Sequence, residues 1–161
     1  MRTFGYPHAA ESTIPQACQQ NAKLNRILVV EDNLLSSKLL KQLLTAHGYE
    51  VLESPEGWQA LNLAHDEQPD LILMDIRLPD INGLEVTRLL KQDDHTKTIP
   101  IVAVTALASP EYERKGLESG CDAYIRKPIT LGNLLRTIES FLKIDAGDAA
   151  NLRYHLAHAV V

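Results

Sequence analysis

Short runs of apolar residues alternate along the chain with segments in which apolar residues recur every three or four positions. A short continuous apolar run is typical of a strand buried on both faces of a sheet, and the wider spacing indicates an amphipathic helix. The pattern occurs five times. The predicted strands are 26–30, 50–54, 70–75, 99–106 and 123–127. The predicted helices include 35–44, 58–64, 84–90, 110–119 and 130–143.

Five strand–helix repeats in succession predict an α/β fold with a parallel sheet covered by helices on both faces. A chain of 161 residues fits one such domain, for which we expect residues 26–143. We expect residues 1–25 to form a flexible extension. The tail at 144–161 has Leu152, Leu156 and Val160 at four-residue spacing, which fits either a short amphipathic helix or a frayed end.

Composition and charge narrow the class of protein. Hydrophobic residues make up 45% and charged residues 23%, as in soluble globular proteins. The net charge is −5 and no polybasic arm is present, so nothing points to nucleic acid or a membrane surface. No apolar run approaches the roughly 18–20 residues that a membrane span needs, and no convincing signal peptide is present, so we expect a cytoplasmic protein. Cys18 and Cys121 lie far apart, which favours two reduced thiols over a disulfide.

Polar residues gather where the predicted strands end. Glu31 and Asp32 follow the first strand, and Asp75 ends the apolar run "LILMD". Thr105 ends the fourth strand and Lys127 the fifth. Each could simply cap a helix or turn, or lie at the surface. Together they should meet, because the carboxyl ends of parallel strands open on one edge of the sheet.

Three carboxylates on one edge predict a bound cation. Two carboxylates about 4 Å apart repel by about 4 kcal/mol at an effective dielectric of 20, so such a cluster binds protons or a hard cation. Mg²⁺ suits carboxylates and commonly bridges them to a phosphate. A lysine and a hydroxyl nearby suit a tetrahedral anion, which points to phosphoryl transfer. Asp75 is the candidate nucleophile, because a carboxylate can attack phosphorus to form an acyl phosphate.

Four segments of the chain carry a resemblance to a known family. "ILVVEDN", "DLILMDIRLPDINGLE", "IPIVAVTA" and "GCDAYIRKPI" resemble the receiver domain of two-component response regulators, the CheY-like family, over residues 26–143. The separations of 43 residues from Asp32 to Asp75, 30 to Thr105 and 22 to Lys127 are also like those of receivers. The segments "EDN", "DLILMDI" and "GLEVT" are most similar to single-domain regulators of the DivK type.

The resemblance implies a doubly wound, flavodoxin-like sheet of five parallel strands in the order 2-1-3-4-5, with five helices. It implies that Asp75 accepts a phosphoryl group from a histidine kinase or a histidine phosphotransfer protein. By the same resemblance, Thr105 would hydrogen-bond the phosphoryl group and Lys127 would pair with it, and the Lys127–Pro128 bond would be cis. The implied ligands of Mg²⁺ are Glu31, Asp32, Asp75 and the backbone carbonyl of Arg77.

Tyr124 falls at the position where the family has its rotating aromatic switch, although a half-buried aromatic on the fifth strand explains it too. Only 18 residues follow the last predicted helix, so we expect the receiver surface itself to contact a downstream protein. No nucleic acid or membrane partner is expected, and a weak homodimer stays open. The protein would be a phosphoacceptor that catalyses its own phosphorylation and dephosphorylation, not an enzyme that turns over a substrate.

Three other functions remain as alternatives. The first is a protein-interaction module with the receiver fold but without phosphorylation. The second is an aspartyl-phosphate hydrolase of the haloacid dehalogenase kind, although such enzymes have an acid two residues after the nucleophile, where this chain has Arg77. A flavin-binding protein is disfavoured, because no Gly/Ser/Thr-rich phosphate loop follows the first strand.

The residues two positions beyond Asp75 and Thr105 predict a long-lived phosphoaspartate. They are Arg77 and Leu107, and the resemblance to receivers implies that these positions flank the path of an attacking water; neither residue offers a general base. We expect slow self-dephosphorylation in Mg²⁺, measured as loss of the labelled protein with time. A half-life of seconds would contradict this expectation.

Overall fold

A computed structural model of the protein describes residues 23–106 and 109–142. The expectations for the amino-terminal extension, for the carboxyl-terminal tail and for Cys18 and Leu107 therefore lie outside the described residues. Within the described part, Cys121 is a free thiol and is buried. No helix in that part of the chain is both long and apolar enough to cross a membrane.

In residues 23–106 and 109–142, five strands alternate with five helices, as the apolar pattern predicts. The strands are β1 (Arg26–Val30), β2 (Glu50–Ser54), β3 (Leu71–Asp75), β4 (Ile101–Thr105) and β5 (Ala123–Arg126). The helices are α1 (Leu34–Ala46), α2 (Gly57–Glu67), α3 (Gly83–Gln92), α4 (Pro110–Glu118) and α5 (Leu131–Phe141).

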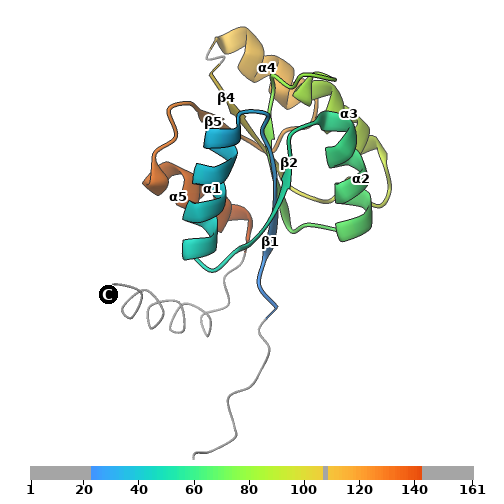
Figure 1. The fold of residues 1–161 in the computed structure, drawn as a ribbon. Helices are drawn as coiled ribbons and strands as arrows, with labels where there is room; N and C mark the ends of the chain where they lie inside the picture. Colours follow the sequence, from blue (N-terminus) through green and yellow to red (C-terminus); the bar gives the residue numbers. More distant parts are fainter. Residues whose placement is uncertain (1–22, 107–108, 143–161) are drawn as a thin grey trace, which may run out of the picture.

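The strands form one sheet in the order β2-β1-β3-β4-β5, and all four neighbouring pairs are parallel. Figure 1 shows α1 and α5 on one face of this sheet and α2 and α3 on the other. The predicted doubly wound fold and its strand order are confirmed. All five strands therefore point their carboxyl ends at the same edge.

Alternate residues of each strand pack on opposite faces of the sheet, because successive side chains of a strand point in opposite directions. In β1, Ile27 and Val29 pack in the cluster with α1 and α5, whereas Leu28 and Val30 pack in the cluster with α2 and α3. All four are at most 1% exposed. This double burial explains why the strands appear in the sequence as continuous apolar runs.

Two strands begin later than the apolar pattern predicts. β3 begins at Leu71 because the Asp70 carboxylate, rather than a strand partner, accepts the Arg26 amide at 2.7 Å. β4 begins at Ile101, since Pro100 has no N–H to donate to the sheet, although its carbonyl still accepts from Ile72 at 3.0 Å. The carboxyl ends of these strands, where the polar residues gather, lie close to the predicted positions.

The loop between β3 and α3 folds back tightly onto the end of β3. Gly83 donates its amide to the Ile76 carbonyl at 2.8 Å. A Cβ atom at Gly83 would lie 2.0 Å from the carbonyl oxygen of Asp75, which is backbone and cannot rotate away. Only glycine fits this close approach, and it brings the start of α3 against the residue that carries the candidate nucleophile.

We expect Gly83→Ala to lower the free energy of unfolding by about 3 kcal/mol, because the new methyl group would overlap backbone atoms. The matched control is Gly132→Ala in α5, where a Cβ atom meets nothing within 4 Å. This control should gain about 1 kcal/mol from the higher helix propensity of alanine. Urea denaturation followed by circular dichroism measures both changes, and equal effects of the two substitutions would contradict the expectation.

Candidate functional site

The carboxyl edge of the sheet brings three acidic side chains together. Glu31 and Asp32 follow β1, and Asp75 is the last residue of β3. Glu31 is 4% exposed and Asp75 is 6% exposed, whereas Asp32 is exposed. Their carboxylate oxygens lie within 4.8 Å of one another.

This cluster has the donor set of a site for a hard divalent cation. Oxygen ligands at this spacing suit Mg²⁺, which binds through a few carboxylates and keeps several waters. The three residues line a cleft of about 660 Å³ together with Arg77 and Lys127. The open cleft leaves room for water ligands and for a phosphoryl donor.

Lys127 bridges the two buried carboxylates. Its Nζ lies 2.6 Å from Oε2 of Glu31 and 2.6 Å from Oδ2 of Asp75. Burial alone would lower the pKa of the Lys127 ammonium, but the hydrogen bonds to Asp75 and Glu31 raise it. Burial also raises the pKa of Glu31, and Lys127 offsets this only in part. The two carboxylates thus favour the charged form of Lys127, whereas burial disfavours the charged form of Glu31.

Backbone amides fix the orientation of the acidic side chains. The amide of Arg77 donates to Oδ1 of Asp75 at 3.0 Å, and the amide of Asn33 donates to Oε1 of Glu31 at 3.2 Å. Asn33 in turn caps α1, because its side chain accepts from two amides of the first turn. Directly after β5, the Lys127 amide donates to the Thr105 carbonyl at 2.9 Å, and the Lys127–Pro128 bond is cis as expected.

Thr105 and Tyr124 lie beside the acidic cluster rather than in its cleft. Thr105 is fully buried at the end of β4, and Tyr124 is half-buried on β5. Burial and the charge of Glu113 raise the pKa of the Tyr124 hydroxyl, while a hydrogen bond with Thr105 lowers it. The Tyr124 ring also lies against Gly116 of α4. The two residues connect the end of β4 to α4.

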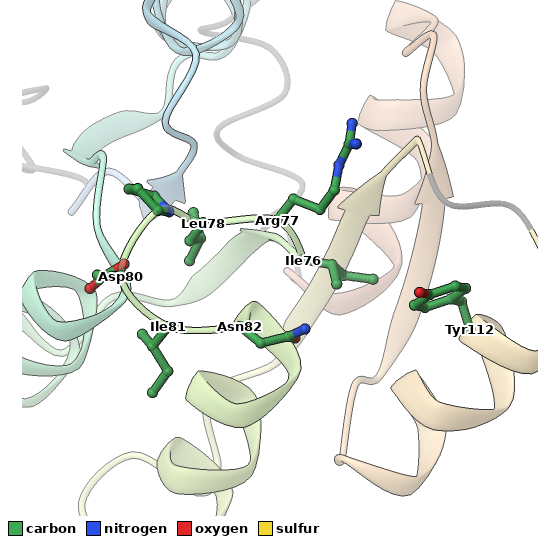
Figure 2. Close-up of a pocket in the computed structure, with 8 residues that line it drawn as sticks. Ile76, Arg77, Leu78, Asp80, Ile81, Asn82 and Tyr112 are labelled. Carbon is green, nitrogen blue, oxygen red and sulfur yellow. The ribbon is translucent and has the colours of Figure 1, made fainter.

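The loop after Asp75 carries polar residues that the sequence pattern did not single out. Figure 2 shows residues 76–82 around a second pocket, of about 380 Å³, that Tyr112 of α4 borders on its other side. Asn82 caps α3 by accepting the Leu84 amide at 2.9 Å. Asp80 accepts two amides of the first turn of α2, from residues that lie 22 and 23 positions earlier in the chain. An asparagine before Gly83 is a recognisable cap signal, but nothing in the sequence pairs Asp80 with α2.

Comparisons with known proteins agree with this geometry. A family profile described as the response regulator receiver domain matches residues 27–139. The polar-differentiation response regulator DivK of Brucella anthropi is 48% identical over 123 residues, which cover 76% of this chain and 97% of that protein. The DivK protein of Brucella ovis is 47% identical over the same length and coverage.

Two solved structures have the same fold. One is the receiver domain of the sensor histidine kinase PA1611 from Pseudomonas aeruginosa PAO1, with a magnesium ion coordinated in its active site cleft. It is 32% identical with a TM-score of 0.69, and the match covers 73% of this chain and 97% of that chain. The BeF3-activated N-terminal receiver domain of Klebsiella pneumoniae RstA is also 32% identical, with a TM-score of 0.70 and coverage of 74% and 100%.

Replacing Lys127 by methionine should lower the free energy of unfolding more than the same replacement at an exposed lysine. Lys127→Met should lower the free energy of unfolding by about 3 kcal/mol, because it leaves two buried carboxylates without a cation. Lys41→Met removes an ion pair with Glu53 in which the lysine side chain is 50% exposed, and should cost less than about 1 kcal/mol. Urea unfolding in a metal-free buffer measures both. Similar losses for the two variants would mean that the Lys127 bridge contributes no more than a surface pair.

Proposed function

The chain belongs to the response regulator receiver family, and from this premise we propose that Asp75 is its phosphoacceptor. The observation that carries the proposal is the meeting of three carboxylates within 4.8 Å beside an ammonium 2.6 Å from two of them. Glu31, Asp32, Asp75 and the backbone carbonyl of Arg77 would hold Mg²⁺. The phosphoryl donor is a histidine kinase or a histidine phosphotransfer protein.

In the proposed transfer, a carboxylate oxygen of Asp75 attacks phosphorus and forms an acyl phosphate, while the bond from phosphorus to the donor nitrogen breaks and its electrons stay with the donor imidazole. When bound, Mg²⁺ neutralises negative charge on the carboxylates and the phosphoryl oxygens. Arg77 keeps Asp75 oriented through its amide, 3.0 Å from Oδ1. Lys127 keeps its proton throughout, and its ammonium passes from a carboxylate oxygen to a phosphoryl oxygen.

Thr105 and Tyr124 form the proposed output of the site. The Thr105 hydroxyl would turn to the phosphoryl group, which weakens its interaction with Tyr124. Tyr124 then changes its packing against α4, and the surface formed by β5 and α4 shifts between two states that bind a downstream protein differently. The burial of Thr105 and the contact of Tyr124 with Gly116 support this role.

The donor surface proposed for the kinase or phosphotransfer protein is the exposed face of α1. Leu34, Leu35 and Leu39 are 66%, 77% and 55% exposed, and Leu34 also lines the acidic cleft. An apolar patch at the mouth of the cleft suits a protein that must present its phosphohistidine to Asp75. The patch supports a protein donor over a free phosphate ester, and hence the receiver function over that of a hydrolase.

Labelling at Asp75 tests the proposed function. We expect acetyl phosphate to add one phosphoryl group to the protein in the presence of Mg²⁺ and none in the presence of EDTA. The adduct is measured by intact mass and by its sensitivity to hydroxylamine, which cleaves acyl phosphates. Asp75→Asn should abolish it, because an amide is not a nucleophile at phosphorus. Asp66→Asn, at an aspartate that is 73% exposed, is the matched control and should label normally.

The other outcomes separate the alternatives. A wild-type protein without a metal-dependent adduct would favour an interaction module that is not phosphorylated. Steady turnover of a small phosphate ester, lost in Asp75→Asn, would favour a hydrolase.

A further inference from the structure

The loop that carries Arg77, the proposed main-chain ligand of the metal, is fastened to the first turn of α2. The residue before this helix, Glu56, makes no side-chain cap. Asp80 supplies the cap instead, since its Oδ1 accepts the Gly57 amide and its Oδ2 accepts the Trp58 amide, both at 2.9 Å. Figure 2 shows the Asp80 carboxylate pointing away from the loop, toward this helix.

Gly57, at the start of α2, packs closely against the same loop. A Cβ atom at this position would lie 2.3 Å from Cγ2 of Ile81 and 3.4 Å from Cδ1 of Leu78. Without a side chain at Gly57, both loop residues can approach the start of α2. The polar contact of Asp80 and the apolar contacts of its neighbours therefore fix one side of the loop.

Charge strengthens the polar contact. Desolvation alone would raise the pKa of Asp80. The hydrogen bonds from the Trp58 and Gly57 amides outweigh it, and the pKa of Asp80 is lowered. The carboxylate is exposed and stays ionised, and an anion at the amino terminus of a helix is stabilised by the helix dipole.

The rest of the loop is held at its two ends. The Arg77 amide is fixed on Asp75 at 3.0 Å, and the Gly83 amide is fixed on Ile76 at 2.8 Å. Asp80 lies between these points and contributes the hydrogen bonds that hold the middle of the loop to another element. Without it, the segment that follows Arg77 would lose its polar anchor.

We propose that Asp80 is a positioning residue for the metal site, which acts through the loop to keep Arg77 at the rim of the acidic cleft. The inference rests on the proposed function, because Arg77 matters only if its carbonyl ligates Mg²⁺. Asp80 contributes no ligand atom. Its effect resembles that of residues behind a ligand, whose loss commonly weakens metal binding by a factor of ten or more.

Calorimetric titration with Mg²⁺ alone tests the proposal. We expect Asp80→Ala to bind Mg²⁺ about tenfold more weakly than the wild type. Asp80→Asn retains an acceptor for the helix amides and should bind within about threefold of the wild type, because asparagine caps helices nearly as well as aspartate. Gly57→Ala would displace the Ile81 side chain that packs against this glycine, and should weaken Mg²⁺ binding even with Asp80 intact.

The matched control is Asp93→Ala, at the opposite edge of the sheet. It removes the same charge and also a carboxylate that accepts a backbone amide, from His95 at 2.9 Å. This variant should bind Mg²⁺ like the wild type. Wild-type affinity in Asp80→Ala, or equal weakening in Asp93→Ala, would overturn the positioning role. A wild-type protein that binds no Mg²⁺ would instead overturn the proposed metal site, and the inference with it.

Discussion

One ammonium group compensates two carboxylates that the fold has removed from water. The Nζ of Lys127 lies 2.6 Å from both Glu31 and Asp75, and the carboxylates are almost fully buried. The three residues come from the ends of β1, β3 and β5, so the bridge also ties together strands that are not all neighbours in the sheet. Buried charge of this kind is stable only while it is paired, and the pairing requires all three strands in register.

The site follows from the topology more than from any single segment. A parallel sheet in the order β2-β1-β3-β4-β5 puts β1, β3 and β4 in its middle, and the acids and Thr105 come from the ends of these three strands. The loops that follow the strands then fix the orientation of the acidic side chains. Asn33 caps α1 and holds Glu31, while the Arg77 amide holds Asp75. Each of the two buried carboxylates is thus oriented by the start of the loop that follows its strand.

Much of this could be predicted from the sequence, because it depends on local periodicity. The five apolar runs predict the strands within two residues, and Asp75, Glu31 and Lys127 stand out as charges at their ends. Asp80 could not be predicted in the same way, since its contact with Gly57 and Trp58 spans more than 20 residues and follows no repeating pattern. The hydrogen bond from the Arg26 amide to the Asp70 carboxylate, which shortens β3, could not be predicted from the sequence for the same reason. Patterns along the chain report burial, whereas contacts between loops depend on the assembled fold.

The division of strand side chains between two faces has an evolutionary consequence. The core under α1 and α5 and the core under α2 and α3 are separate clusters, with the sheet backbone between them. Tyr124 belongs to a third small cluster with Ile76, Ala103 and Cys121. Substitutions that alter the exposed leucines of α1 therefore need no compensating change near Tyr124. Under the proposed function, a lineage could change its upstream phosphoryl donor through substitutions in α1 while the surface formed by β5 and α4 still binds the same downstream protein.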